Sequence, residues 1–345
     1  MTKTILALAG DGIGPEIMTA GLAVLKEQIR RHQLDMIIQE KDFGGAAIDS
    51  SGHPLPSETL QAAKEADAIL LAAIGGPQYD KAVVRPEEGL LSLRKELQLF
   101  ANLRPVKIFD SLSHLSPLKA ERIAGVDFLV VRELTGGIYF GQHELDENRA
   151  SDVNEYSREE IERIVRLAFE QARLRRKKVT SIDKQNVLAT SKLWRQVADQ
   201  VALDYPDVTL EHQLVDSAAM LLVTNPSKFD VIVTENLFGD ILSDEASVLS
   251  GTLGVMPSAS HSVEGPSLYE PIHGSAPDIA GKGLANPISM ILSVSMMLRD
   301  SFGLETAALE IEEAVQKTLS QGIFTQDLGG KASTQDMLEA ILMNL

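Results

Sequence analysis

The sequence predicts a protein of the α/β class, with a mainly parallel sheet flanked by helices and a second lobe inserted in the first. Short apolar runs alternate with segments whose apolar residues recur every three or four positions, which is the pattern of strands followed by helices. A chain of 345 residues is long for one core. Because no flexible linker divides it, we expect residues 100–251 to form a domain inserted in a first domain of residues 1–99 and 252–345.

Six short apolar runs are predicted as strands, because such runs between turn or polar residues are typical of a buried sheet. Aromatic residues make up only 5% of the chain, so the core that these strands build must be mostly aliphatic. The predicted strands are residues 5–9, 68–72, 128–132, 179–182, 210–215 and 231–234.

Local signals mark the beginnings of three helices. Residues 18–29 place four apolar side chains on one helix face, and Pro15 suits the first turn of that helix. Ser157 and Glu160 have the spacing of a capping box, in which each side chain binds the other residue's backbone N–H. Pro287 opens a third, strongly apolar helix.

Composition excludes several classes of function. The 49 acidic residues outnumber the 32 basic ones and give a net charge of -17, which repels nucleic-acid phosphates, so we expect no nucleic-acid partner. The lack of cysteine excludes disulfides, thiolate metal sites and a cysteine nucleophile. The apolar run at residues 5–9 is too short for a signal sequence or a membrane span. We therefore expect a cytoplasmic protein that does not bind membranes.

The glycine-rich turn from Gly10 to Pro15 lies between a predicted strand and a predicted helix. It resembles a dinucleotide fingerprint, but Pro15 stands where that motif needs its third glycine. We therefore do not predict a Rossmann fold, and a tight turn between strand and helix explains the glycines equally well.

Acidic residues follow two of the predicted strands. Asp240 and Asp244 are four apart and so share one face of a helix, where two carboxylates repel each other unless a cation neutralises them. Oxygen ligands suit Mg²⁺ or Mn²⁺, and the carboxyl ends of strands are where open α/β sheets bind ligands. Asp216 occupies a similar place and is a candidate third ligand. The alternative is a pair of exposed acids that only favour a helix N-terminus.

Three arginines border apolar segments, which in an acidic protein indicates specific partners. Arg94, Arg104 and Arg132 are candidates for bidentate carboxylate recognition, and structural salt bridges are the equally open alternative.

Two further side chains could transfer protons. Lys184 follows the strand at 179–182, where a nearby metal could lower its pKa and make it a base. Tyr139 could donate a proton, and it lies in a polar, aromatic stretch, residues 136–154, that we expect to form a hairpin-like arm for contact with a second copy. A solvent-facing lysine and a tyrosine that only packs the arm remain the alternatives.

Residues 271–283 are rich in small side chains, which allow a nucleotide to approach the backbone closely. Asp278 is the kind of acid that accepts hydrogen bonds from ribose hydroxyls and repels a 2′-phosphate. A structured loop without a ligand has the same composition.

In this order, these motifs are similar to those of the isocitrate and isopropylmalate dehydrogenase family. The similarity runs from the Gly10–Pro15 turn to the last helices, and residues 236–255 resemble the segment most specific to the family. The resemblance implies a non-Rossmann fold of two α/β lobes that flank a cleft, and a homodimer whose active sites borrow residues across the interface. It also implies NAD and Mg²⁺ or Mn²⁺ as cofactors.

The resemblance assigns roles residue by residue. Tyr139 would protonate the enol and Lys184, from the other subunit, would accept the hydroxyl proton. Asp240 and Asp244 would bind the metal with Asp216 of the other subunit. Residues assigned to the substrate are Arg94, Arg104, Arg132, Asp216, Leu90, Leu91, Glu87 and Val187. Residues assigned to the nucleotide are Ile13, Gly75, Gly76, Asn186, His273, Gly274, Ser275, Ala276, Asp278, Ile279 and Asn286.

Two positions sort the family's members. Isocitrate enzymes carry Ser and Asn for the third carboxylate in the stretch before the first arginine, which here is residues 85–94. Leu90 and Leu91 of this stretch cannot bind a carboxylate, and burying an unpaired one is costly. They favour a branched alkyl group, so the expected reaction is oxidative decarboxylation of (2R,3S)-3-isopropylmalate to 4-methyl-2-oxopentanoate, a step of leucine biosynthesis. Asp278 and Ile279 stand where NADP-dependent members carry Lys and Tyr, which indicates NAD. This chain departs from many members at Tyr79, where they have Trp, but both side chains are flat aromatics.

Three rival functions remain open. A sister dehydrogenase acting on D-malate, tartrate or homoisocitrate would share the same motifs. A metal-dependent phosphoryl-transfer enzyme could use the Asp240 and Asp244 pair, but the chain has no phosphate-cradling P-loop. A non-catalytic nucleotide-binding module would need few of the arginines and acids.

Overall fold

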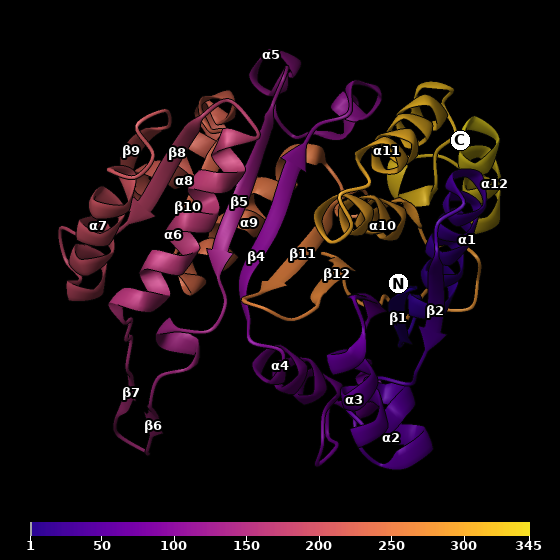
Figure 1. The fold of residues 1–345 in the computed structure, drawn as a ribbon, viewed down its shortest axis with the longest axis horizontal. Coiled ribbons are helices and arrows are strands. Elements are labelled where there is room, and N and C mark those ends of the chain that lie inside the picture. Colours follow the sequence, from indigo (N-terminus) through magenta and orange to yellow (C-terminus); the bar gives the residue numbers. More distant parts are fainter. Residues whose placement is uncertain (1) are drawn as a thin grey trace. The chain divides into compact units, whose positions relative to one another are not determined.

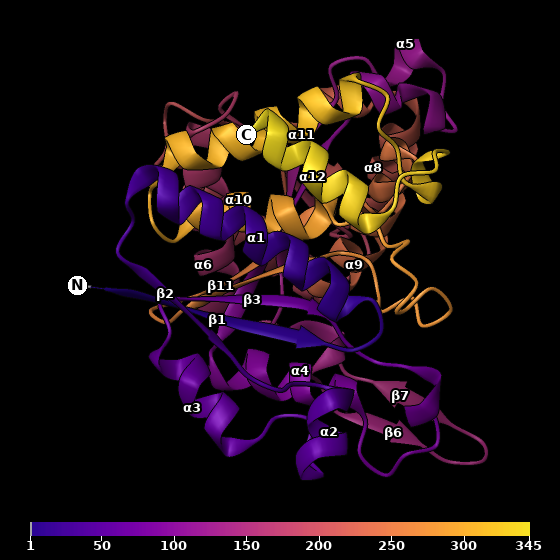
Figure 2. The same ribbon diagram turned by 90° about the vertical axis from the view of Figure 1, so that its right-hand side faces the viewer.

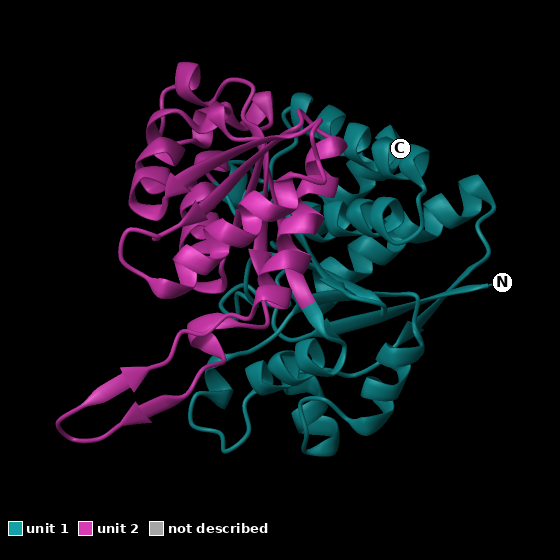
Figure 3. Cartoon of the chain, turned by 60° about the vertical axis from the view of Figure 1, so that its left-hand side comes forward, with its two compact units in different colours: residues 1–99, 252–345 teal, residues 100–251 magenta. Residues whose placement is uncertain are grey.

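The computed structural model describes residues 2–345. The chain divides into two compact units, which we call unit 1 (residues 1–99 and 252–345) and unit 2 (residues 100–251), coloured separately in Figure 3. The division falls at the residues expected from the sequence. The expected roles, nucleotide binding for unit 1 and metal, substrate and dimer contacts for unit 2, stay predictions. Each unit is an α/β structure with its own strands and helices (Figure 1).

Unit 1 contains five strands in the order β2-β1-β3-β12-β11. The pairs β1–β2, β1–β3 and β3–β12 are parallel, whereas β11–β12 is antiparallel. Every residue of β3 is buried, as expected of a strand that is covered on both faces. The strands are β1 (Lys3–Gly10), β2 (Met36–Glu40), β3 (Ala68–Ala73), β11 (Pro257–Ser262) and β12 (Ser267–Pro271).

Helices cover both faces of these strands. Figure 2 shows α1, α10, α11 and α12 on one side of β1 and β3, and α2, α3 and α4 on the other. Pro15 lies in the first turn of α1, as predicted. The helices of unit 1 are α1 (Gly14–His32), α2 (Gly45–Ser51), α3 (Ser57–Glu65), α4 (Pro86–Glu96), α10 (Ile288–Asp300), α11 (Glu305–Ser320) and α12 (Thr334–Asn344).

Unit 2 contains strands in the order β4-β5-β10-β8-β9 and a separate two-stranded hairpin. The β4–β5 pair is antiparallel, whereas β5–β10, β10–β8 and β8–β9 are parallel. The hairpin is the arm expected at 136–154, and Figure 3 shows it reaching away from the rest of unit 2. The strands are β4 (Leu99–Lys107), β5 (Asp127–Glu133), β6 (His143–Leu145), β7 (Ala150–Asp152), β8 (Lys178–Asp183), β9 (Thr209–Leu214) and β10 (Val231–Thr234).

The helices of unit 2 lie on opposite faces of its strands, with α6 in front and α8 and α9 behind in Figure 1. The predicted capping box is present: Ser157 Oγ accepts from Glu160 N at 3.2 Å, and Glu160 Oε2 accepts from Ser157 N at 2.8 Å. The helices are α5 (Ala120–Ile123), α6 (Arg158–Arg173), α7 (Ala189–Ala202), α8 (Val215–Thr224) and α9 (Asn236–Ser247).

The predicted strands are confirmed, with one boundary corrected. The run at 210–215 ends as a strand at Leu214, and Val215 opens α8 with Asp216 in its first turn, where an acid is favourable. Two antiparallel pairs interrupt the parallel pattern that we expected. Within residues 2–345 no helix combines the length and the apolar content that crossing a membrane requires.

Candidate active site

Asp240 and Asp244 lie one turn apart on α9, which begins directly after β10. The predicted spacing of two acids on one helix face is therefore confirmed. Their side chains differ in exposure, at 36% for Asp240 and 74% for Asp244. Each acid is met by a different arginine of unit 2.

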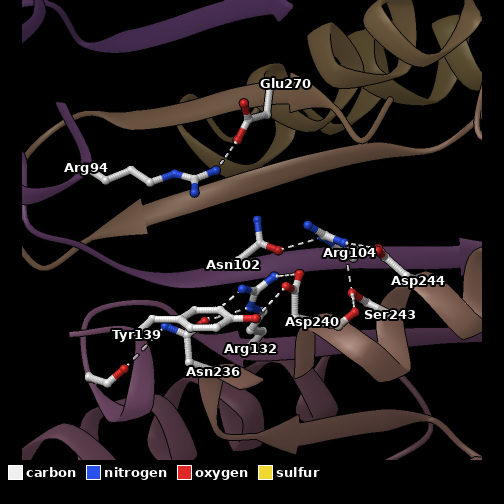
Figure 4. Close-up of polar contacts among 11 residues, drawn as sticks. Arg94, Asn102, Arg104, Arg132, Tyr139, Asn236, Asp240, Ser243, Asp244 and Glu270 are labelled. Carbon is white, nitrogen blue, oxygen red and sulfur yellow. Dashed lines mark hydrogen bonds and ion pairs between the residues drawn. The ribbon is translucent and has the colours of Figure 1, made fainter. Parts of the chain in front are cut away.

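Asp240 joins Arg132 and Tyr139 (Figure 4). Arg132, whose side chain is only 9% exposed, bonds Asp240 Oδ1 through NH1. The Tyr139 hydroxyl donates to Asp240 Oδ2 at 2.9 Å, and the Arg132 guanidinium lies 5.9 Å from the centre of the Tyr139 ring. Burial, followed by the hydrogen bond to Asp240, raises the pKa of Tyr139 above its usual 10.0. The phenol therefore keeps its proton at neutral pH.

Arg132 is oriented by Asn236, the first residue of α9. Asn236 Oδ1 accepts from Arg132 Nε at 3.0 Å and from NH2 at 2.8 Å, while its Nδ2 donates to Gly136 O at 3.3 Å. Asn236 is almost completely buried. Sequence reasoning did not assign it a role, although it opens the segment of highest family specificity.

Asp244 joins Arg104, whose NH1 lies 3.0 Å from Asp244 Oδ1 and donates to Ser243 Oγ at 2.8 Å. Arg104 Nε also donates to Asn102 Oδ1 at 2.9 Å. Both acids of α9 thus face a guanidinium fixed by neutral oxygen acceptors. This geometry holds two cations of fixed orientation beside two carboxylates.

The Tyr139 side chain is presented by the short turn Gly137–Tyr139, which starts the arm. Gly137 has φ +78°, and a Cβ there would lie 2.3 Å from the Tyr156 hydroxyl. Only glycine fits this backbone and this close approach. Gly137 therefore lets the turn pack tightly against Tyr156.

Lys184 and Asp216 form a second group in unit 2, from the end of β8 and the start of α8. Lys184 Nζ lies 2.7 Å from Asp216 Oδ1, and this bond lowers the pKa of Asp216. Among residues 2–345 no three carboxylates or imidazoles are arranged to hold a metal ion. One chain therefore does not bring Asp216 together with Asp240 and Asp244.

In unit 1, α4 places Glu87, Leu90, Leu91 and Arg94 on neighbouring positions of one face. Arg94 NH2 donates to Glu270 Oε1 at 3.0 Å (Figure 4). Leu91 is 53% exposed, whereas Leu90 packs partly against the core cluster of unit 1. In unit 2, Val187 is 64% exposed and Asn186 is also exposed.

Unit 1 contains a cavity of about 580 Å³. Six residues assigned to the nucleotide line it: Ile13, His273, Gly274, Ala276, Ile279 and Asn286. His273 Nε2 is buried and has no hydrogen-bond partner among residues 2–345, and burial lowers the pKa of this imidazole below its usual 6.5. The cavity is therefore lined by an imidazole whose Nδ1 lies 3.0 Å from Gly274 O while its Nε2 has no partner among residues 2–345.

The wall of this cavity is held by the Gly10–Pro15 turn. Ile13 N donates to Ser275 O at 2.8 Å, and a Cβ on Gly12, which has φ +59°, would lie 2.1 Å from that same oxygen. The glycine of the turn serves this close approach of two loops.

Four further residues of unit 1 that the resemblance assigns to the nucleotide, Gly75, Gly76, Ser275 and Asp278, are not among those that line the cavity. Asp278 is exposed, and Lys282 Nζ donates to its backbone oxygen at 2.7 Å. Gly75 N donates to Asp11 Oδ2 at 2.8 Å. The Glu87 carboxylate lies close to Gly75, where it would be 2.9 Å from an added Cβ. A Cβ on Gly76 would meet the Gln78 side chain.

Two acids of unit 1 have roles that sequence reasoning missed. Asp327 lines the cavity, and its Oδ2 accepts from Asn286 Nδ2 and from Thr252 Oγ1, each at 3.0 Å. Asp11 is buried and accepts from the backbone N–H groups of Gly45 and Gly75, each at 2.8 Å. Asp240 was found because it follows a strand and has a second acid four residues later on the same helix. Asp11 and Asp327 lack such a partner.

A family model described as isocitrate/isopropylmalate dehydrogenase matches residues 4–341. A Streptococcus mutans protein named 3-isopropylmalate dehydrogenase is 75% identical over 99% of this chain and 100% of its own length. A Lactococcus lactis protein of that name is 67% identical over 100% of this chain and 99% of its own.

Solved structures are similar over the same length. The isocitrate dehydrogenase from Methylococcus capsulatus has a TM-score of 0.88 at 35% identity, covering 99% of both chains. A β-decarboxylating dehydrogenase from Thermococcus kodakarensis has a TM-score of 0.86 at 38% identity, covering 99% of this chain and 96% of that one. Together with the family match over residues 4–341, these similarities mean that the chain belongs to the isocitrate/isopropylmalate dehydrogenase family.

Proposed function

We propose that this chain catalyses the oxidative decarboxylation of (2R,3S)-3-isopropylmalate to 4-methyl-2-oxopentanoate with reduction of NAD, as a step of leucine biosynthesis in the cytoplasm. The observation that carries the proposal is the meeting of Arg132, Asp240 and Tyr139. It combines a guanidinium for a substrate carboxylate, a carboxylate for a metal and a proton donor. The name of the relatives at 75% and 67% identity supports the same reaction.

The arginines recognise the substrate in this proposal. Arg104 and Arg132 are fixed by Asn102 and Asn236, so their forks are already oriented for the two malate carboxylates. A dianion approaching a chain of net charge -17 needs such a local cluster of positive charge. Arg94 is the third arginine assigned to the substrate by the resemblance.

Two side chains move protons. Lys184 accepts the hydroxyl proton of the substrate, and its 2.7 Å contact with Asp216 supports a relay through that carboxylate. After CO₂ leaves, Tyr139 gives its proton to the carbon that lost the carboxyl group. The raised pKa of Tyr139 supports this role, because the phenol is protonated when the reaction begins.

The chemistry of the acids suits Mg²⁺ or Mn²⁺, since three carboxylates offer only hard oxygen donors. When bound, the cation supplies Lewis acidity at the substrate hydroxyl and the adjacent carboxylate. Asp240 and Asp244 of one chain would hold it with Asp216 of a second copy. A site shared by two copies is supported because, among residues 2–345 of one chain, no three acids or histidines are arranged to hold a metal ion.

The cavity of unit 1 suits a nucleotide. When bound, NAD accepts the hydride from C2 of the substrate. Buried polar atoms are nearly always hydrogen-bonded, so the unpaired Nε2 of His273 points to a polar ligand group in the roughly 580 Å³ space. Asp278 beside this cavity would disfavour a 2′-phosphate and hence NADP.

A homodimer is part of the proposal. On α8, Met220 and Val223 follow Asp216 at helical spacing and are 63% and 43% exposed. On and just after α9, Ile241 and Val248 are 59% and 53% exposed. Exposed apolar stripes beside the acids of the site indicate a surface that a second copy covers, which would also deliver Asp216 and Lys184.

The test is NADH formation with 3-isopropylmalate, D-malate and isocitrate compared under NAD and Mg²⁺. Strong preference for 3-isopropylmalate, loss of activity with a chelator and weak activity with NADP are expected. Preference for D-malate would leave the reaction type but remove the branched-alkyl role of Leu90 and Leu91. No NADH with any substrate would overturn the proposal.

A further inference from the structure

Three neighbouring strands of unit 2 end in buried acids at one level of the sheet. β10 pairs in parallel with β5 on one side and with β8 on the other. The register of these ladders makes Glu133, Glu235 and Asp183 neighbours at the carboxyl edge, with Glu235 in the middle. Their exposed fractions are 0%, 5% and 1%. Three negative charges in such a buried row repel one another unless each is compensated.

The two outer acids are compensated. Glu133 accepts from Thr135 Oγ1 at 2.7 Å and from two backbone N–H groups of the turn that follows, and Arg163 lies 3.5 Å away. Asp183 accepts from Arg195 Nε at 2.9 Å and from its NH2 at 3.1 Å. Each outer acid therefore has an arginine from a neighbouring helix that compensates its charge.

The central acid has no such partner. Among residues 2–345 the Glu235 carboxylate accepts a single hydrogen bond, from Asn154 Nδ2, at a long 3.4 Å. Asn154 Oδ1 is itself buried without a donor. An ionised Glu235 can only accept, whereas a protonated one can donate to an amide oxygen. The Glu235 carboxylate therefore has only one long hydrogen bond, and the side chain that donates it carries a buried acceptor without a donor.

We propose that Glu235 is a positioning residue that works as a neutral carboxylic acid and, in that form, holds the first turn of α9 in place at the active site. The positioning role of α9 at the active site rests on the proposed function. The protonation of Glu235 does not depend on it.

The connection to the site is short. Glu235 is the residue that precedes α9, and the next residue, Asn236, receives both guanidinium bonds from Arg132. Asp240 follows one turn later with its bond from Tyr139. Ionisation of Glu235 would push this turn away from Glu133 and Asp183, and any movement reaches Asn236 through one peptide bond.

The surroundings favour the neutral form. Burial, aided by the charge of Glu133, raises the pKa of Glu235 to about 7. Burial also raises the pKa of Glu133, but its hydrogen-bond donors and Arg163 oppose the shift. The ionisable groups on the elements packed around Glu235 are Arg132 and Glu133 of β5, Asp183 of β8, Tyr156, Arg163 of α6 and Arg195 of α7.

Neither helix capping nor cation binding accounts for this row of acids. A helix N-terminus favours negative charge, but the Glu235 side chain caps no N–H of α9. A cation site would need the three acids to converge, and among residues 2–345 no group of acids and histidines is arranged to bind a metal ion.

Infrared spectroscopy of the whole protein without substrate tests the protonation directly. Just below neutral pH the wild-type protein should show the C=O stretching band of a protonated carboxylic acid and lose it as the pH is raised. E235Q should lack this band at every pH well above the value of about 4 at which ordinary carboxyl groups titrate. The control E155Q, which removes an exposed acid one residue from Tyr156, should keep it. A wild-type spectrum without this band, or one that E235Q leaves unchanged, overturns the proposal.

The pH profile of turnover tests the positioning role. The ratio of kcat in E235Q to kcat in the wild type should rise several-fold as the pH is raised through neutrality, because only the wild-type residue can ionise. The same ratio for E155Q should stay constant. If the ratio of kcat in E235Q to kcat in the wild type is the same at all pH values, Glu235 has only a structural role, and the proposed positioning role is wrong. If neither protein forms NADH, the proposed function fails, and the infrared result still decides the protonation.

Discussion

Tyr139 and Arg132 hold the same carboxylate from opposite oxygens: the phenol donates to Asp240 Oδ2 at 2.9 Å, and the guanidinium bonds Oδ1. A phenol and a guanidinium are thus fixed by one acid. Since Arg132 is fixed in turn by Asn236, the orientation of all three depends on the first two turns of α9. The site is therefore set by one helix and the strand ends beside it.

Tyr139→Phe should lower kcat by roughly 10²- to 10⁴-fold, the usual contribution of a positioned general acid, with little change in KM for the substrate. The ring remains and only the hydroxyl is lost, so Arg132 keeps its bonds to Asn236. NADH formation and product formation should be followed together, because oxidation precedes the protonation step. An unchanged rate of product formation would remove Tyr139 from the reaction.

Asp240→Asn and Asp244→Asn should each weaken Mg²⁺ or Mn²⁺ activation by more than about tenfold, a loss seen even for outer-shell partners. Asp240→Asn should also raise KM for the substrate, because Arg132 loses the carboxylate that orients it. Asp244 is 74% exposed and affects Arg104 instead. Metal titrations of activity measure both effects, and Asp204→Asn, on the surface of unit 2, is the control. Identical titration curves for all variants would exclude the metal role.

Most of the fold could be predicted from local signals. The capping box of Ser157 and Glu160 opens α6 as expected, and the wholly apolar runs of β3 and β10 are buried strands. Strands without an apolar run were missed, such as β4 with Asn102 and Arg104 in its middle and β11, which is mostly Ser and Ala. Their strand geometry comes from pairing with neighbours, which a single sequence does not reveal.

The residues of the candidate site were found through chemistry that is visible in sequence: two acids at helical spacing and arginines beside apolar runs. Glu235 and Glu133 could not be found this way, because an acid beside a strand is normally solvated. Only the register of β5, β10 and β8 shows that both are buried next to each other. Asp327 was missed because it lies in a short 3-10 helix, Gln326–Leu328, far along the chain from the cavity residues that the sequence suggested.

NAD binding should stay constant as the pH is lowered to 6.5, the usual pKa of histidine, since burial lowers the pKa of His273 below that value. An exposed histidine would be half protonated there. The folded state holds fewer protons on His273 than the unfolded chain, so lowering the pH below 6.5 should favour unfolding. Calorimetric NAD titrations from neutral pH down to pH 6.5, with His273→Asn as the comparison, measure the NAD affinity. A tenfold loss of affinity already at pH 6.5 would contradict a neutral imidazole.

Ile241→Arg should weaken association of two copies without unfolding the chain. Its side chain is 59% exposed, so a charge there costs little in an isolated chain but much in an apolar interface. Sedimentation equilibrium should show a lower molecular mass for the variant than for the wild type at equal concentration, with unchanged circular dichroism. Leu309→Arg, at another exposed apolar position, in unit 1 and 42% exposed, is the control. A monomeric wild type would contradict the proposed dimer.

A shared active site makes a sharper prediction, because inactive chains should then restore each other. If Asp240 acts with Lys184 of a second copy, a dimer of one Asp240→Asn chain and one Lys184→Ala chain contains one intact site and one doubly defective site. Random mixing of equal amounts should therefore recover about a quarter of wild-type activity per chain, since half of the dimers are mixed and each has one working site. Asp240→Asn mixed with Asp244→Asn should recover nothing, because both defects belong to the same chain's part of the site. Full inactivity of the first mixture, with mixed dimers detected by mass spectrometry, would place Lys184 and Asp240 of one chain in one site.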